Sequence, residues 1–262
     1  MTDFGYKDLN VLYEDNHIIV VLKPQNVPSQ ADESGDTDML SVVKEYIKNK
    51  YNKPGNVYVG LVHRLDRPTG GVMVFAKTSK AAERLCDAIK NGDFEKKYLC
   101  VTCGEPKPLN GTLTHYLKKN EKTNTVAIVP MMTEGAKKAE LQYSVLETKN
   151  GFSLVKVTLL TGRSHQIRAQ MAFNGTPLFA DAKYGADKRT LKHNLGLWAT
   201  ILRFSHPTTG ETLAFIAYPP EDVSPWKAFE LGRYLNIAAV TDPYGNMKNY
   251  IDYAKTEGKK ED

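Results

Sequence analysis

The sequence is poor in cysteine, with three in 262 residues. Because an odd number of thiols cannot all pair within one chain, a disulfide framework is excluded. Long apolar runs are also missing, since none approaches the roughly 18 residues that a membrane span requires. The segment 1–14 carries Asp3, Lys7 and Asp8 where a signal peptide would have an apolar core. These absences predict a cytoplasmic protein that has no membrane partner.

Motifs for cofactors and metals are absent as well. The chain has no G-x-G-x-x-G fingerprint, no Walker loop and no G-x-S-x-G elbow. Cys100 and Cys103 are spaced like a pair of zinc ligands, but a second such pair and a suitably spaced histidine pair are both missing. In a strand these two thiols would also point to opposite faces. The sequence therefore predicts no cofactor and no metal site.

The chain does carry a modest excess of positive charge. Its formal net charge is +5 and its isoelectric point is about 8.9. Lysine and arginine gain affinity for nucleic acids by releasing counterions from phosphates, so this balance favours a polyanionic partner. Hydrophobic residues make up 41% of the chain and charged residues 25%, as in ordinary globular proteins. This composition excludes disordered, collagen-like and coiled-coil classes.

The spacing of apolar residues predicts many strands and few helices. Strand character is expected at 11–13, 17–22, 57–65, 72–76, 98–103, 113–130 and 141–160. The last of these segments should be a hairpin that turns at Asn150-Gly151. Helices are expected at 40–47, at 79–91 with Ser79 as N-cap and Gly92 as C-terminal stop, and at 164–174 with Ser164 as N-cap.

Strands without a regular β-α-β alternation predict an α+β fold on a large, mostly antiparallel mixed sheet with flanking helices and loops. One catalytic domain is expected over 11–235, after a lead-in at 1–10. An extension is expected at 236–262, and its charged end should fray. We expect a monomer with no obligate protein partner.

The densest polar segment runs from His63 to Gly71, between two apolar stretches. If it is extended, Arg64 and Asp66 project to one face, because strand side chains alternate. Neighbouring guanidinium charges favour the ionised carboxylate, so Asp66 is a candidate nucleophile or base. The alternative interpretation is a structural Arg–Asp salt bridge that closes a turn.

A second polar segment runs from Thr161 to Arg168. The N–H groups in the first turn of the following helix, beside Arg163 and Arg168, suit a phosphate or a carboxylate. The alternative is that both arginines lie on a solvated face. Ile167 and Met171 are four residues apart and are expected to make core contacts.

These segments together resemble the RluA-type pseudouridine synthases. His63–Gly71 is similar to the HRLDxxTSG signature of that family, and the similarity spans about residues 11–220. It also includes Leu22-Lys23-Pro24, Val27-Pro28, Lys96–Leu99, Gly162–Arg168 and Asp181–Gly185. Two departures stand out. Gly70 replaces the usual serine, and the chain leaves no room before the catalytic domain for the S4 RNA-binding module of many relatives, so the catalytic domain itself is expected to recognise RNA.

The resemblance implies isomerisation of a uridine in ribosomal or transfer RNA, with no cofactor. Asp66 matches the essential carboxylate, which acts either by covalent attack or by forming an unsaturated sugar. Tyr98 matches the tyrosine that packs on the uracil and is a candidate base. Arg168 matches the basic residue that pairs with the aspartate. Only folding can bring these three residues together, because they are far apart in the sequence.

Four further residues are candidates for substrate binding. Arg64 is expected near the RNA backbone or the vacated stack, since the target uridine must leave the helical stack. Ile167 is expected against the base, and Arg163 suits phosphate. His63 either contacts substrate or supports the turn.

Two other functions compete with this interpretation. A catalytically silent protein could use the same fold only to bind and remodel RNA, and it would be indifferent to Asp66. A hydrolase of nucleosides or glycosides would need a second carboxylate, for which Asp181 is the candidate.

Overall fold

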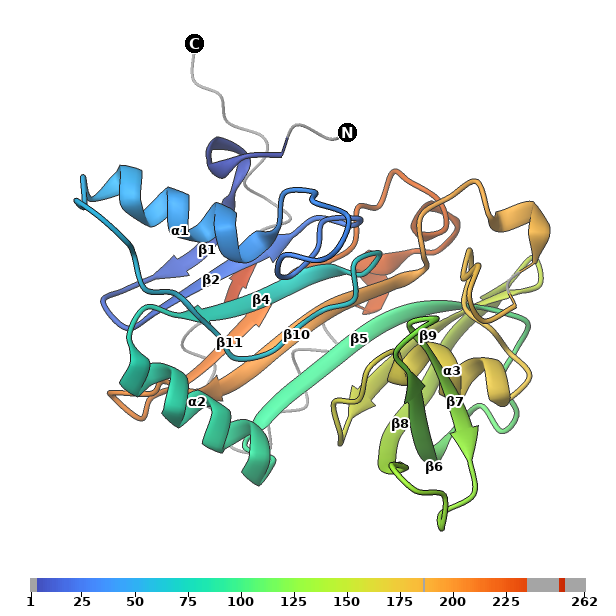
Figure 1. The fold of residues 1–262 in the computed structure, drawn as a ribbon. Helices are drawn as coiled ribbons and strands as arrows, with labels where there is room; N and C mark the ends of the chain where they lie inside the picture. Colours follow the sequence, from blue (N-terminus) through green and yellow to red (C-terminus); the bar gives the residue numbers. More distant parts are fainter. Residues whose placement is uncertain (1–3, 186, 235–249, 253–262) are drawn as a thin grey trace. The chain divides into compact units, whose positions relative to one another are not determined.

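The computed structural model describes residues 4–185, 187–234 and 250–252 (Figure 1). These residues form two compact units. The first unit contains the described residues up to Glu95, together with Ala199–Tyr218 and 250–252. The second contains Lys96–Trp198 and 219–234. A single domain over 11–235 stays a prediction, and the extension at 236–262 lies outside the described residues except for 250–252.

Strands of the first unit pair in the order β1–β2–β4–β10, with β3 beside β4 and β11 beside β10. The strands are β1 (Asn10–Glu14), β2 (Ile18–Lys23), β3 (Gly60–Leu61), β4 (Gly70–Ala76), β10 (Leu197–Ser205), β11 (Thr212–Ile216) and β12 (Tyr250–Asp252). The pairs β1–β2, β2–β4 and β10–β11 are antiparallel, whereas β11–β12 is parallel. The strand expected over 57–65 is reduced to the two residues of β3, so that prediction was wrong in extent.

Two helices belong to the first unit, α1 (Met39–Lys50) and α2 (Ser79–Asn91). Asp38 caps α1, and its carboxylate accepts from the Ser41 N–H. The expected N-cap of α2 was wrong by one residue. Thr78, with an extended backbone, accepts from the Ala81 N–H, and Ser79 is already helical. Gly92 ends α2 in the left-handed conformation at φ 84°, as predicted.

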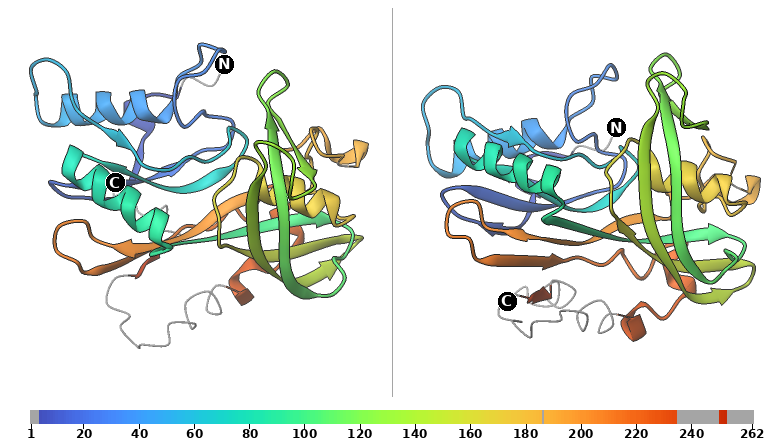
Figure 2. Two further views of the ribbon diagram at one scale, coloured as in Figure 1. Left: turned by 60° about the horizontal axis from the view of Figure 1, so that its bottom comes forward. Right: turned by 90° about the horizontal axis from the view of Figure 1, so that it is seen from below.

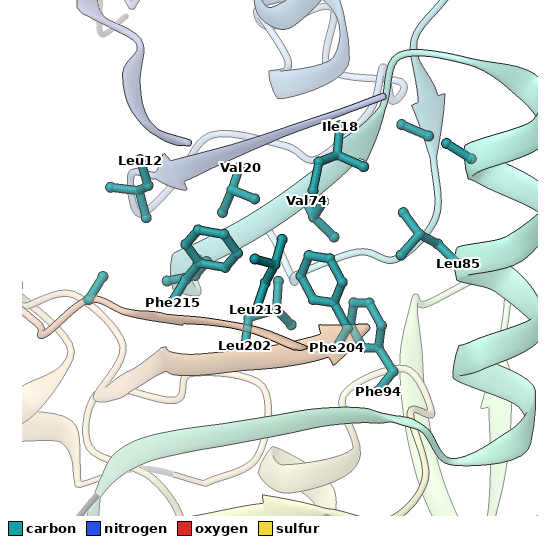
Figure 3. Close-up of a cluster of buried hydrophobic side chains, with 14 residues drawn as sticks. Leu12, Ile18, Val20, Val74, Leu85, Phe94, Leu202, Phe204, Leu213 and Phe215 are labelled. Atoms are coloured by element: carbon teal, nitrogen blue, oxygen red, sulfur yellow. The ribbon is translucent and has the colours of Figure 1, made fainter. Parts of the chain in front are cut away.

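The core of the first unit collects apolar side chains from strands that are distant in sequence (Figure 3). Leu12 and Ile18 come from the first hairpin, and Leu85 comes from α2. Phe94 stacks on Phe204 with ring centroids 5.2 Å apart. Leu202 and Phe204 are two residues apart on β10, and Leu213 and Phe215 are two residues apart on β11, so each pair points to one face of its strand.

Strands of the second unit pair in the order β5–β9–β8–β6–β7, and each of these pairs is antiparallel. They are β5 (Phe94–Cys103), β6 (Asn110–Asn120), β7 (Thr125–Val129), β8 (Lys137–Lys149) and β9 (Phe152–Leu159). The hairpin at Asn150-Gly151 is confirmed, with φ angles of 54° and 79° at its two turn residues. Antiparallel strands with a few flanking helices confirm the α+β fold.

The helix of the second unit, α3 (Gln166–Phe173), is shorter than the expected 164–174. His165 precedes it in the left-handed conformation at φ 50°, and no side chain caps its N-terminus. Ser164 as N-cap was therefore wrong. The Gln166 side chain turns back toward the preceding loop, where its Oε1 accepts from the Arg163 N–H at 3.0 Å and from the Thr161 hydroxyl at 2.8 Å.

Short 3-10 turns also lie among the described residues, at η1 (Tyr6–Asp8), η2 (Lys188–Thr190) and η3 (Trp226–Ala228), and residues 231–234 are helical. The first of them lies within the lead-in expected at 1–10. Among the residues that the structure describes, no helix combines the length and the apolar character needed to cross a membrane.

Candidate active site

Asp66 lies in the first unit, on the loop that leads from β3 into β4. The residue before it is fixed by one buried hydroxyl. Ser29 Oγ donates to the Leu65 carbonyl at 2.7 Å and accepts from the Leu65 N–H at 3.1 Å. Both residues are buried, whereas Asp66 itself is half-buried. The backbone that carries the carboxylate is therefore anchored, and the residue itself is partly exposed.

Each backbone carbonyl from residue 66 to residue 69 accepts a hydrogen bond. The Asp66 carbonyl accepts from the Thr69 N–H at 2.9 Å, which closes a turn. The Arg67 carbonyl accepts from the Asn26 N–H at 2.8 Å, and the Pro68 carbonyl accepts from Gln25 Nε2 at 3.0 Å. Because buried peptide groups are costly to leave unpaired, these bonds specify one conformation of the loop.

The amine of Lys23 completes this arrangement. Lys23 is 0% exposed, and its Nζ donates to the carbonyls of Thr69 at 2.7 Å, Arg67 at 3.0 Å and Pro24 at 3.1 Å. An ammonium group has three protons, so these three acceptors match it. Burial lowers the pKa of this amine to about 7, and the charge of the nearby Asp66 opposes that shift.

Gly71 is required where the loop enters β4. Its φ is +126°, and a Cβ built there would lie 2.2 Å from the Ala199 carbonyl oxygen. A side chain at this position would therefore meet both backbone strain and backbone atoms.

Two arginines flank Asp66 in the sequence, and the structure places them differently. Arg64 is exposed. Arg67 donates from Nε to the Asn26 carbonyl at 3.2 Å and from Nη1 to Ser34 Oγ at 3.0 Å, and its Nη2 pairs with Asp36. Arg67 therefore forms a salt bridge with Asp36, which lies outside the segment His63–Gly71 for which a structural Arg–Asp bridge was the alternative. Hydrogen bonds from Arg67 and Ser34 lower the pKa of Asp36.

His63 supports the loop within the first unit. Its Nε2 accepts from the Val74 N–H at 3.1 Å, and its ring lies 5.5 Å from the ring of Phe94. These contacts tie the start of the loop to β4 and to the core, which is the supporting role weighed for this residue.

Tyr98 and Arg168 belong to the second unit. Tyr98 is buried on β5. Arg168, on α3, forms a bidentate ion pair with Asp181, from Nε to Oδ2 at 2.8 Å and from Nη2 to Oδ1 at 2.7 Å. Its guanidinium carbon lies 5.2 Å from the centre of the Tyr184 ring. The arginine is therefore held in one plane by a carboxylate and an aromatic ring.

Asp181 has no exposed surface, and both of its oxygens accept from Arg168. Its Oδ1 also accepts from the Lys183 N–H at 3.2 Å. A general acid or base must exchange protons with substrate, and a carboxylate engaged in this way is poorly suited to that role. This arrangement weighs against Asp181 as the second acid of a hydrolase.

The segment before α3 is less open than its sequence indicates. Arg163 is exposed, and its Nε donates to the Lys138 carbonyl at 2.9 Å. Its N–H, which lies just before the expected helix, is bonded to Gln166. Ile167 and Met171 are 4% and 0% exposed, which agrees with core contacts.

The described residues give little support for cysteine or metal chemistry. Cys100 is buried and Cys103 is half-buried, and burial raises the pKa of both thiols. Within the described ranges, no group of three His, Cys, Asp or Glu side chains is arranged to hold a metal ion.

The loop is held by Lys23, Gln25 and Ser29, and no role in holding it was predicted for them from the sequence. A signal was present for the first of them, because Lys23 ends the apolar run of β2 immediately before Pro24. A lysine at the end of a buried strand must find partners for its charge, and those partners are the loop carbonyls.

Comparison with known proteins gives one consistent answer. A family model described as RNA pseudouridylate synthase matches residues 17–173. The RNA pseudouridine synthase YlyB of Bacillus subtilis is 33% identical over 220 residues, which cover 83% of this chain and 71% of that protein. Ribosomal large subunit pseudouridine synthase D of Vibrio cholerae is 32% identical over 229 residues, covering 82% and 68% of the two chains.

Solved structures show the same fold. Human RNA pseudouridylate synthase domain containing 1 aligns with a TM-score of 0.69 at 21% identity, over 92% of this chain and 98% of that one. Human RNA pseudouridylate synthase domain containing 4 aligns with a TM-score of 0.66 at 24% identity, over 80% and 88%.

Proposed function

Because the chain belongs to the RNA pseudouridylate synthase family and is an RNA-modifying isomerase, we propose that it converts uridine to pseudouridine in ribosomal RNA with Asp66 as the essential carboxylate. Relatives named for the ribosomal large subunit support ribosomal RNA over transfer RNA as the substrate. In this isomerisation the N1–C1′ bond breaks and a C1′–C5 bond forms. The hydrogen at C5 leaves as a proton and N1 gains one, so the reaction needs no other reactant.

The observation that carries the assignment is the anchored loop around Asp66. The carbonyls of residues 66–69 are each bonded, and the half-buried carboxylate is the acidic group that this loop presents. A charged group acts most effectively when its position is set before substrate arrives, because no reorganisation is then needed during the reaction. We assign Asp66 to the reaction at the ribose or the uracil when the N1–C1′ bond breaks.

Tyr98 and Arg168 have supporting roles in this proposal. Tyr98 is assigned to packing against the uracil and to removal of the C5 proton. Arg168 is assigned to orienting Asp66 and keeping it ionised. The ion pair with Asp181 supports that role, because Nε and Nη2 fix the plane of the guanidinium group. Arg64, which is exposed, is assigned to the RNA backbone.

The proposal is tested by tritium release from RNA labelled at uracil C5. Ribosomal and transfer RNA are purified separately from cells that lack this gene, so that the target uridine is unmodified in both. The wild-type protein should release tritium from ribosomal RNA. Asp66→Asn should lower the rate by more than about a thousandfold while it keeps the fold and RNA binding.

Asp87→Asn is the matched control, because it removes a carboxylate from an exposed position of α2 in the same unit. It should release tritium at the wild-type rate. Substantial release by Asp66→Asn would overturn the assigned chemistry, and release from transfer RNA alone would overturn the assigned substrate. No release by wild type, with RNA still bound, would favour a remodelling protein.

A further inference from the structure

The sheet of the second unit has two unlike faces. Residues that lie directly opposite in an antiparallel pair share a face, so Leu117 and Ala139 point to the same side as Leu113 and Leu141. This side packs against α3, where Leu117, Val126 and Ala139 meet Ala169. In both views of Figure 2, α3 lies along one side of these strands.

The candidate base lies on that covered side. Tyr98 pairs with Val157, and Val157 pairs with Tyr143, which is two residues from Leu141 on β8. The opposite face is therefore separated from Tyr98 by the thickness of the sheet. Whatever binds there acts away from the uracil itself.

On β6 and β8 the opposite face is polar and exposed, whereas on β5 and β9 it also carries the buried Leu99 and Leu154. Thr112 lies opposite Gln142, and Thr114 lies opposite Glu140. Thr112, Thr114 and Gln142 are all exposed. These hydroxyl and amide groups can donate hydrogen bonds to phosphate oxygens without regard to sequence.

Lysines gather on this face in two pairs. Lys138 on β8 lies opposite Tyr116 on β6, and Lys118 is two residues beyond Tyr116. The two lysines are therefore diagonal neighbours, with Cα atoms about 7 Å apart. Lys97 lies opposite Thr158, two residues from Lys156, and forms the second diagonal pair. We call this surface, with Lys97, Thr112, Thr114, Lys118, Lys138 and Lys156, the lysine face.

The charge of the lysine face is more one-sided than that of the chain. The whole chain has 35 basic and 30 acidic residues. On this side of β5–β9, Lys149 joins the four lysines. The acidic residues on it are Glu95, which lies 3.9 Å from Arg203, Glu140, which binds Lys138 at 2.7 Å, and Glu147, which accepts from the Tyr234 hydroxyl at 3.4 Å. Partial burial and the charge of Lys97 both lower the pKa of Lys156. Like charges held together in this way favour an anionic occupant.

The distance between the two lysine pairs indicates how large an anion must be to contact both of them. Lys156 lies opposite Ser144 on β8, and Lys138 is on that same strand about 20 Å away at the usual rise per residue. A single phosphate cannot reach both pairs, whereas a nucleic acid strand can. Lysine ammonium groups act on phosphates as point charges, and this suits binding that does not depend on base sequence.

We propose that the lysine face is an RNA-binding surface, which holds the backbone of the substrate RNA outside the target nucleotide. The proposal rests on RNA being the substrate and adds the place where flanking phosphates bind. It accounts for the exposed threonines and for the two lysine pairs together.

The test compares two double variants, Lys118→Gln/Lys138→Gln and Lys97→Gln/Lys156→Gln. The control is Lys80→Gln/Lys90→Gln on α2, because both control lysines are exposed. The control matches the Lys118/Lys138 variant closely, because each removes one lysine that forms a surface ion pair. Lys138 pairs with Glu140, and Lys90 pairs with Asp87. All variants are made in the Asp66→Asn background, so that turnover does not complicate binding.

The measured quantity is the affinity for unmodified, transcribed large-subunit ribosomal RNA at several salt concentrations. Each lysine-face pair should weaken binding about threefold to tenfold at moderate salt. The slope of log affinity against log salt should become shallower by about 1.5, since each lost phosphate contact removes about 0.7–0.9. An unchanged slope, or an equal loss in the control pair, would overturn the proposal.

A footprint gives a second readout that does not depend on the variants. The protein is acetylated at lysine by an activated ester with and without the same RNA, and modified sites are quantified by mass spectrometry. RNA should protect Lys97, Lys118, Lys138 and Lys156 but leave Lys80 and Lys90 reactive. Full reactivity of the lysine face with RNA bound would overturn the proposal and leave an acidic protein segment as the occupant. Failure of the proposed function is recognised separately, by absence of tritium release from the wild-type protein.

Discussion

The two polar segments that carry the candidate catalytic groups are held in different ways. The loop around Asp66 is held through its own backbone, whose carbonyls accept from Lys23, Gln25 and Asn26. Arg168 is held instead through its side chain, by charge-assisted bonds to a single buried carboxylate.

This difference follows from what each group has to present. The position of a nucleophile or base can be fixed through its backbone, so that its carboxylate need not be anchored by the bonds that hold the loop. A guanidinium group has five donors in one plane, so two can be used for anchoring without loss of its charge. We therefore expect that breaking the Arg168–Asp181 ion pair lowers the free energy of unfolding more than breaking the backbone contacts of the Asp66 loop. Stability, turnover and pH dependence should distinguish the two losses.

The largest effect is expected at the end of the Asp66 loop. Gly71→Ala places a methyl group 2.2 Å from the Ala199 carbonyl oxygen at a φ of +126°. Since backbone atoms cannot move aside cheaply, we expect a loss above about 4 kcal/mol in the free energy of unfolding, or no soluble protein. Denaturant unfolding measures it. Gly5→Ala, where the nearest atom to the new Cβ is 3.9 Å away, is the control and should change stability by less than about 1 kcal/mol.

The second largest effect on stability is expected at the ion pair between Arg168 and Asp181. Arg168→Met leaves the Asp181 carboxylate buried and uncompensated, and we expect a loss of about 3–5 kcal/mol in stability together with most of the turnover. Arg168→Met combined with Asp181→Leu removes both charges and should restore much of the stability. Turnover should stay low in the double variant if Arg168 serves the reaction. Recovery of turnover along with stability would show that Arg168 has only a structural role.

A smaller effect is expected at the buried amine. Lys23→Met keeps the volume but removes donors to three carbonyls, and we expect a loss of about 2 kcal/mol in the free energy of unfolding. The cost is lower than for Arg168 because the Arg67 carbonyl keeps the Asn26 N–H and no charge is left unpaired. Thermal unfolding measures it, with exposed Lys90→Met as the control. A loss as large as that of Arg168→Met would contradict the comparison.

A change of one pH unit is expected to have the smallest effect on stability. In the unfolded chain Lys23 keeps its proton up to about pH 10, whereas burial lowers its pKa to about 7 in the folded protein. Between these values the unfolded state binds more protons, so the contribution of this group to stability rises with pH, by up to about 1.4 kcal/mol per pH unit. The free energies of unfolding of wild type and Lys23→Met should therefore diverge above pH 7. Parallel curves would rule out this titration.

Features fixed by neighbours in the sequence were predictable. The Asn150-Gly151 turn and the Gly92 stop need only the conformational freedom of one or two residues. The N-caps were less secure, because Thr78 and Ser79 can both accept a hydrogen bond and only the backbone conformation decides between them. At α3 no side chain caps the helix, and the residue before it is left-handed, which no pattern of cap residues indicates.

The support of the candidate site could not be predicted, because its partners are distant in the chain. Lys23 contacts carbonyls 44 and 46 residues away, and Ser29 contacts a residue 36 away. The motif resemblance pointed to Asp66 without giving any reason for the geometry of its loop. The fold supplies that reason, by pairing β2 with β4 so that the end of one strand lies beside the start of the other.

The order of synthesis gives the division of the chain into two units a further consequence. The ribosome releases strands β5–β9 and α3 before β10 and β11 exist, because residues 96–198 interrupt the first unit. Until then the core around Ile18 and Leu85 lacks Leu202, Phe204, Leu213 and Phe215, and its apolar surface stays in water. Strands β5–β9, which pair with one another, can therefore pair first, and the unit that carries Asp66 waits about a hundred residues for β10 and β11. Chaperones that shield exposed apolar strands would act on the N-terminal segment during that interval.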